Sequence, residues 1–184
     1  MTLDDPNQVQ PDESASLKAT VLRYGLIGGL VLIIYGLIGF LTGLSSPGNL
    51  SNIFINLVLA LVITVGLVVL AIRHHRDQGL GGHITFGRAF LVGFLTIIIA
   101  GVISLAFNYL YLSFVEPDYL ANMANDMQAM YERMGLSEEQ IEEAMKRVED
   151  MTPASMIVQG LISQSVMGAI VGAIVAAIMK RKPE

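Results

Sequence analysis

Apolar residues fill four long segments of the chain, and polar residues lie mainly between them. None of the four segments contains an acidic residue. A helix of about 20 apolar residues, rising about 1.5 Å per residue, crosses the roughly 30 Å hydrocarbon core of a bilayer. The pattern therefore predicts an all-α integral membrane bundle of four transmembrane helices, at residues 21–44, 53–72, 89–114 and 154–179.

The segment between the third and fourth spans, residues 116–152, has a different period. Its apolar residues recur every three or four positions, which places them on one face of a helix; they include Tyr119, Leu120, Met123, Met127, Met130 and Met134. Gly135 can take the left-handed conformation of a helix C-cap, and Ser137 is placed to begin a second helix with a capping box. Thr152 and Pro153 are suited to open the last span. We predict a helical hairpin outside the membrane.

The amino-terminal residues 1–17 hold four acidic side chains, two prolines and no apolar period. This composition is typical of a disordered tail. A signal peptide is not expected, because the segment lacks a basic start and no small-residue cleavage pattern follows the first span. The membrane domain, hairpin included, is predicted to cover residues 18–182.

The positive charges predict the orientation of the bundle. Lys and Arg gather before span one, between spans two and three, and after span four, at Lys18, Arg23, Arg73, Arg76, Arg88, Lys180, Arg181 and Lys182. With four spans, these three regions share one side, and the positive-inside rule places that side in the cytoplasm. Both termini are then cytoplasmic, and the acidic segment 116–152 is extracytoplasmic.

Composition agrees with one membrane domain. Of the 184 residues, 53% are hydrophobic, and the mean hydropathy is +0.60. The chain has no cysteine, so neither disulfides nor thiolate metal sites are available to it.

The loop between spans two and three, RHHRDQGLGGHITFGRAFLVGF, combines an arginine-rich exit, a Gly-Gly turn and a Phe-Gly entry. Together with the acidic hairpin and the glycine-rich last span, it resembles the bacterial membrane proteins catalogued as domain of unknown function 4199. The resemblance runs from Leu17 to Lys182. The positions that match best are Arg76, Gly81, Gly82, Phe86 and Gly87, whereas His74, His75 and His83 depart from the pattern. The resemblance implies four spans in a bacterial inner membrane and carries no activity.

Two groups of residues are candidate metal ligands. His74, His75, Asp77 and His83 could ligate a divalent cation. Their spacing matches no known ligand motif, and we expect solvated side chains at the membrane interface. The methionine stripe Met123, Met127, Met130 and Met134 could bind Cu(I). Packing of the hairpin is the favoured interpretation of this stripe, with a partner-binding surface as the alternative before copper.

Away from the ends of the spans, the polar residues are uncharged. Asn108 and Gln164 are predicted to hydrogen-bond between helices. No ionisable residue lies near the middle of a span, which disfavours a proton-coupled transporter. Small residues recur at helical spacing and predict close helix packing; they are Gly25 and Gly29 in span one and Gly160, Gly168, Gly172 and Ala176 in span four. Span one is the expected neighbour of span four, and a homodimer contact is the alternative.

No nucleophile stands beside a base, no carboxylate pair has catalytic spacing and no phosphate-binding loop is present, so an enzyme is not predicted. We expect a non-enzymatic scaffold or interaction protein of the bacterial envelope, without cofactor or resident metal. The expected partners are the bilayer and an envelope protein, with a homodimer left open and no nucleic acid. The alternative function is a small transport or permeation component that handles Cu(I).

Overall fold

The computed structural model describes residues 13–45 and 48–181, and within these ranges every element is a helix apart from one isolated β-bridge. The elements are α1 (Glu13–Thr42), α2 (Leu50–His74), the π-helix η1 (His75–Gly79), α3 (Phe86–Phe114), α4 (Tyr119–Arg133), α5 (Glu138–Glu149) and α6 (Pro153–Met179). Four of them, α1, α2 with η1, α3 and α6, are long and apolar enough to cross a membrane. The predicted all-α class is confirmed, and each of the four predicted spans falls in one of these helices.

Two boundaries differ from the sequence-based expectation. Helix α1 extends back to Glu13, into the predicted tail, whereas residues 1–12 lie outside the described ranges. At the other boundary, α2 continues without a break into η1 and ends only at Gly79. A π-turn carries one more residue per turn than an α-helix does, so it changes the direction in which nearby side chains point.

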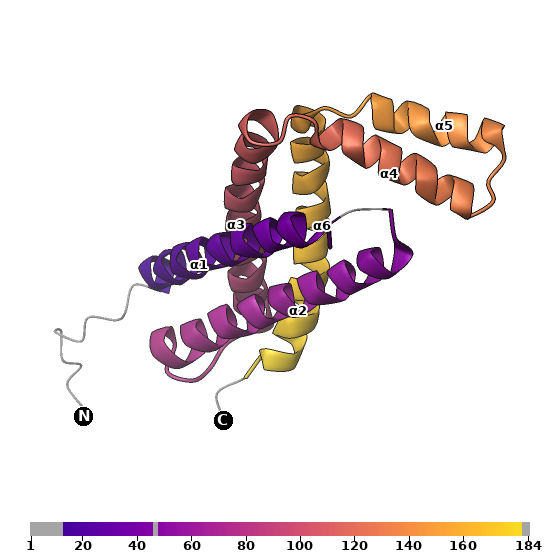
Figure 1. Cartoon of the computed structure of the whole chain (residues 1–184). Helices are drawn as coiled ribbons and strands as arrows, with labels where there is room; N and C mark the ends of the chain where they lie inside the picture. The colour runs from indigo at the N-terminus through magenta and orange to yellow at the C-terminus, as the bar shows by residue number, and fades with distance from the viewer. Residues whose placement is uncertain (1–12, 46–47, 182–184) are drawn as a thin grey trace, which may run out of the picture.

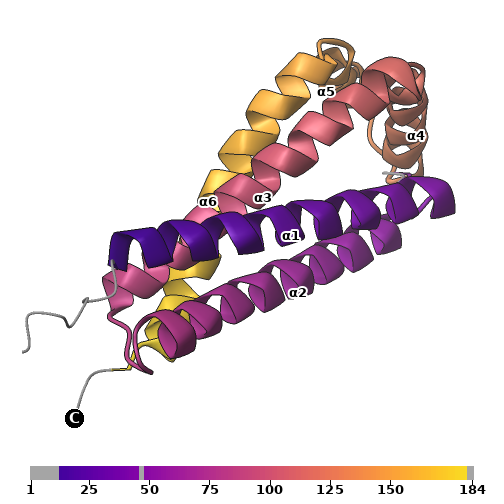
Figure 2. The same ribbon diagram turned by 90° about the vertical axis from the view of Figure 1, so that its left-hand side faces the viewer.

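Helix α3 is the centre of the bundle. It packs along α6 and along α1, and α2 contacts both α3 and α6. Helices α1 and α2 form one pair, and α3 and α6 form another. Figures 1 and 2 show that the two pairs meet where α1 begins and α2 ends. Figure 2 shows the two pairs spreading apart toward the other end.

The tightest packing lies at the end where the helices meet. Six apolar residues there have no exposed surface: Val68, Ala71, Ile72, Ala89, Val92 and Ala176. They come from the last turns of α2 and α6 and the first turns of α3. This end of the bundle is therefore closed.

Close approach of α1 to α3 depends on glycine. A Cβ atom on Gly25 would lie 2.5 Å from Cγ2 of Ile99, and one on Gly29 would lie 2.8 Å from Cβ of Ile103. Real Cβ atoms do not approach so closely, so α1 can lie against α3 only because these residues have no side chain. Close backbone approach of this kind stabilises helix pairs in lipid, where the hydrophobic effect between helices is absent.

The small residues of α6 also lie against α3. A Cβ atom on Gly168 would lie 3.3 Å from Cγ2 of Ile97, and one on Gly172 would lie 3.5 Å from the backbone nitrogen of Phe94. Ala176 is fully buried. The expectation that span one is the neighbour of this face is wrong. Helix α3 lies between α1 and α6, so both small faces meet α3.

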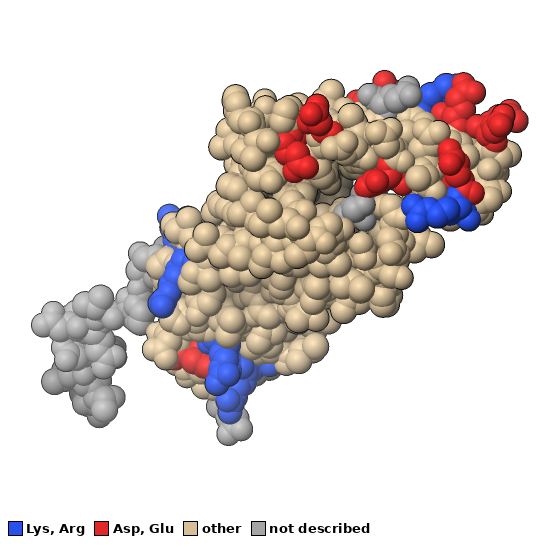
Figure 3. All heavy atoms as spheres, viewed as in Figure 1, with Lys and Arg blue, Asp and Glu red and all other residues tan. Residues whose placement is uncertain are grey.

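Charge is divided between the two ends of the molecule. Figure 3 shows Lys and Arg where α1 begins and where α2 and α6 end, whereas Asp and Glu gather mainly over α4 and α5, with a few Lys and Arg among them. The acidic Asp77 is an exception at the basic end, and it forms ion pairs with Arg76 (2.7 Å) and Arg73 (3.6 Å).

Helices α4 and α5 are separated by a short turn whose signals were readable in the sequence. Gly135 has φ +75°, and the amide of Leu136 donates to the carbonyl of Tyr131, which is a Schellman arrangement. Ser137 and Gln140 form the predicted capping box. Thr152 caps α6, and Pro153 is its first residue.

Candidate functional site

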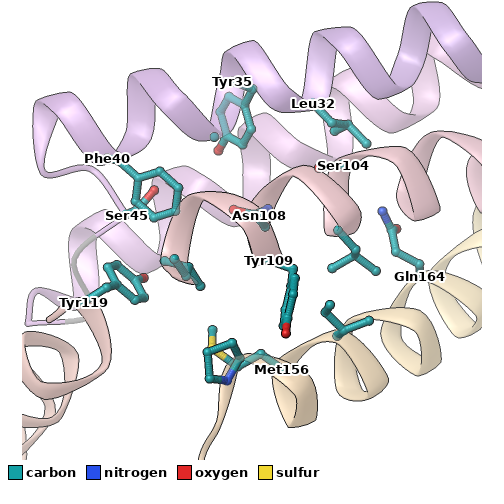
Figure 4. A pocket seen from close by; sticks show the side chains of 15 residues that line it. Leu32, Tyr35, Phe40, Ser45, Ser104, Asn108, Tyr109, Tyr119, Met156 and Gln164 are labelled. Atoms are coloured by element: carbon teal, nitrogen blue, oxygen red, sulfur yellow. The ribbon is translucent and has the colours of Figure 1, made fainter. Parts of the chain in front are cut away.

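A cavity of about 330 Å³ lies between α1, α3 and α6, in the half of the bundle away from the basic end (Figure 4). Tyr119, the first residue of α4, and Ser45, in the connection between α1 and α2, complete its wall. Its lining includes the polar, aromatic and thioether side chains of Tyr35, Phe40, Ser45, Ser104, Asn108, Tyr109, Tyr119, Met156 and Gln164. Many of them are polar, although the surrounding helices are apolar.

Tyr35 is held by the neighbouring helix α2. Its hydroxyl donates to the side-chain oxygen and to the backbone carbonyl of Asn56, the latter at 3.2 Å. The side-chain amide of Asn56 donates in turn to the carbonyl of Leu44, beside the turn. This network satisfies polar groups that would otherwise be costly in an apolar environment, and it fixes one wall of the cavity.

Two carboxamides line the cavity from opposite helices. Asn108 comes from α3 and Gln164 from α6 (Figure 4). The structure shows no hydrogen bond between either side chain and another described residue, so the predicted interhelical hydrogen bonds of Asn108 and Gln164 are not formed. Gln164 instead lies over Gly101, where a Cβ atom would be 3.0 Å from its Cγ and Nε2 atoms. The carboxamides offer donors and acceptors to a molecule in the cavity.

Aromatic rings line the side of the cavity next to the start of α4, which we call its mouth. Phe40 stacks on Tyr111 with ring centroids 5.2 Å apart, and it meets Tyr119 edge-on at 5.3 Å. These geometries are favourable for aromatic pairs. These two ring contacts join the end of α1 to the end of α3 and to the start of α4.

The mouth is acidic. A second hollow of about 130 Å³ shares Phe40, Ser45 and Tyr119 with the cavity, and Glu116 and Asp126 also line it. Burial raises the pKa of the Tyr119 phenol, and the charges of the same two carboxylates raise it further. The phenol is therefore neutral at physiological pH and can donate a hydrogen bond.

The cavity can bind a small molecule by hydrogen bonds and aromatic contact. Its described lining contains no charged side chain. The carboxylates at the mouth attract cations, and aromatic faces such as those of Phe40 and Tyr35 accommodate them by cation–π attraction.

A known protein family matches nearly the whole described bundle. Residues 23–181 match the family described as protein of unknown function (DUF4199). The chain belongs to this family. The region that matches DUF4199 contains most of α1, all of α2, α3 and α6, the α4–α5 segment and the cavity. No curated protein and no solved structure matches the chain.

The predicted site residues of this DUF4199 protein fall in different places. The glycines of α1 and α6 lie in the contacts with α3, and Gly160 lies beside Leu105, which lines the cavity. The methionine stripe lies on α4: Met123, Met127 and Met130 are half-buried, and Met134 is 53% exposed. Met123 lines the acidic hollow. Among the described residues, no three His, Cys, Asp or Glu side chains are grouped so that they could hold a metal ion.

His75 contradicts the expectation of a solvated side chain, because it has no exposed surface. Arg88 donates from Nε to His75 Nε2 at 3.1 Å, and His75 Nδ1 lies 3.3 Å from the hydroxyl of Thr20. A guanidinium can only donate, so Nε2 accepts and Nδ1 carries the proton. The Thr20 hydroxyl donates onward to the carbonyl of Ser16 at 2.9 Å. This chain of bonds joins α1, η1 and α3, because the helix continues past the predicted end of the span.

Sequence reasoning missed the aromatic part of the site. Tyr35, Phe40, Tyr109 and Tyr119 were not identified as site residues. A signal was present, since Tyr35 and Phe40 lie in the last third of α1, and Tyr109 lies beside Asn108 near the end of α3. Polar and aromatic residues gathered in the same half of several spans indicate a common site, provided the order of the helices is known.

Proposed function

We propose that this protein is a non-enzymatic interaction protein of a bacterial inner membrane that binds a small organic cation in the cavity between α1, α3 and α6. One observation carries the proposal: a hydrogen-bonding and aromatic cavity with an acidic mouth lies inside an otherwise apolar bundle. The side chains that line it do not place a nucleophile beside a base. Reversible binding is the chemistry that these groups support.

The charge distribution supports an orientation for this activity. The basic end faces the cytoplasm under the positive-inside rule, so both termini are cytoplasmic. The α4–α5 segment and the mouth of the cavity then face the extracytoplasmic side. The tightly packed basic end closes the bundle toward the cytoplasm, and the ligand enters from outside.

The test uses the absence of cysteine. Ser104 is 9% exposed and lines the cavity, whereas Thr96, two turns earlier on α3, is fully buried and does not line it. Ser104→Cys and Thr96→Cys are introduced singly. Intact spheroplasts are then treated with membrane-impermeant methanethiosulfonates that carry either trimethylammonium or sulfonate.

Ser104→Cys should react with the cationic reagent about tenfold faster than with the anionic one, because the carboxylates at the mouth concentrate cations. Neutralising the mouth with Glu116→Gln and Asp126→Asn should remove most of that preference. Thr96→Cys should stay unreactive. Equal rates for the two reagents, or no reaction at Ser104→Cys from outside, would overturn the proposal.

A second candidate is a permeation component for Cu(I). The positions of two thioethers favour this function. Met123 lines the acidic hollow, and Met156 lines the adjoining cavity. Thioether sulfur is a soft ligand suited to Cu(I). Cu(I) uptake into proteoliposomes that is lost in Met123→Leu and Met156→Leu, but kept in Met134→Leu, would favour this function over the first.

A further inference from the structure

A third hollow, of about 480 Å³, lies at the basic end of the bundle, away from the cavity and the acidic hollow described above. The loop after η1, the first turns of α3 and the residue two positions beyond α6 line it together. Its cationic or hydrogen-bonding side chains are His83, Thr85, Arg88 and Arg181, and its apolar side chains include Leu80 and Leu91. The function proposed above does not involve this hollow.

The electrostatic character of this hollow is positive. Arg88 and Arg181 bring two guanidinium groups from different elements, and no carboxylate lies among the described lining residues. Asp77, at the same end, is engaged by Arg73 and Arg76. The amino terminus of the 29-residue helix α3 adds a partial positive charge at the same place.

Separate contacts hold the backbone of Arg181 and the side chain of Arg88. Ile84 and Arg181 exchange two backbone hydrogen bonds, each of 2.9 Å, which fix the end of α6 against the start of α3. Arg88 is anchored through Nε on the buried His75. A site whose backbone and part of whose side chains are already ordered loses less entropy when it binds a ligand.

We infer that this hollow binds a phosphate group. Guanidinium forks match the oxygens of phosphate, and a helix amino terminus favours the same anion. The expected source is the headgroup of an anionic phospholipid, because the hollow lies at the basic end of the spans and because Leu91, 44% exposed, continues its wall along α3. Free inorganic phosphate shares this chemistry and is the other source.

The test is titration calorimetry on the full-length protein in a neutral detergent. The probes are dihexanoyl phosphatidylglycerol, dihexanoyl phosphatidylcholine and sodium phosphate. The central variant is Arg181→Gln, which leaves the backbone bridge to Ile84 intact. Lys180→Gln is the matched control, because it removes the same charge from the neighbouring exposed residue, which does not line the hollow.

Arg181→Gln should weaken binding of phosphatidylglycerol about tenfold, the loss expected for one charge-assisted hydrogen bond. Lys180→Gln should change it by less than about twofold, because an isolated surface charge contributes little. Arg88→Gln is a second variant, and its circular dichroism shows whether the helices are retained. If sodium phosphate binds and competes with the lipid, the hollow accepts free phosphate as well as the headgroup. If sodium phosphate does not bind, the lipid headgroup is the ligand.

Two results would overturn the inference. One is binding of phosphatidylglycerol that Arg181→Gln and Lys180→Gln reduce equally. The other is equal affinity for phosphatidylcholine and phosphatidylglycerol, which would show that the hollow takes acyl chains and does not select an anion. The cysteine experiment on the first cavity is unaffected by either result, so the two proposals can fail separately.

Discussion

The contact between α1 and α3 can be broken by a single methyl group. In Gly25→Ala, the new Cβ would lie 2.5 Å from Cγ2 and 2.7 Å from Cβ of Ile99. Rotation about χ1 moves the Cγ2 atom, but the Cβ atom is fixed to the backbone of α3. The clash is therefore relieved only when the two helices move apart.

The magnitude follows from two opposing effects. Alanine stabilises a helix interior by about 0.5 to 1 kcal/mol relative to glycine, whereas overpacking of a tight contact costs about 1 to 3 kcal/mol. Gly25→Ala should therefore lose about 0.5 to 2 kcal/mol of stability. Gly66→Ala on α2 is the control, because a Cβ there meets nothing within 4 Å and only the gain in helix propensity remains.

The assay is thermal unfolding of the purified protein in detergent, followed by circular dichroism of the helical band. Gly25→Ala should unfold at a lower temperature than the wild type, and Gly66→Ala at the same or a slightly higher one. The shift should not depend on protein concentration, because the contact lies within one chain. If Gly25→Ala is as stable as Gly66→Ala, the close packing of α1 on α3 is wrong.

Three further outcomes are expected. For topology, Glu139→Cys should react with an impermeant maleimide on intact spheroplasts and Gln78→Cys only after lysis; the reverse pattern would invert the orientation. For the methionine stripe, Met127→Leu and Met130→Leu should each cost less than about 1.5 kcal/mol, because volume is conserved; a larger loss in thermal unfolding would contradict simple packing. For Tyr119, the folded pKa lies above the unfolded one, so its contribution to stability is present below the unfolded pKa and is lost as pH rises through the folded pKa. Tyr119→Phe should reduce the alkaline loss of stability, and an unchanged alkaline profile would contradict the shift.

The candidate site was only partly readable from the sequence. Asn108 and Gln164 were recognisable as polar residues within apolar spans, but not as two walls of one cavity. That requires knowing that α3 and α6 are neighbours and that the helix pairs spread apart at the acidic end. His75 shows the same limit, since its burial depends on Thr20 and Arg88, which are far from it in the chain.

The sequence by itself determined the features that depend on local composition. Span lengths follow from the thickness of the bilayer, and the turns at Gly135, Ser137 and Thr152 follow from caps formed within a few residues. The separation of basic and acidic ends follows from the order of charges and spans. Only the tertiary structure decided that α3 receives the small faces of both α1 and α6, that His75 is buried and that a polar cavity opens beside Tyr119. The physical reason is that a small or polar residue marks a surface able to make a close contact, while the partner of that contact is set by how the helices cross.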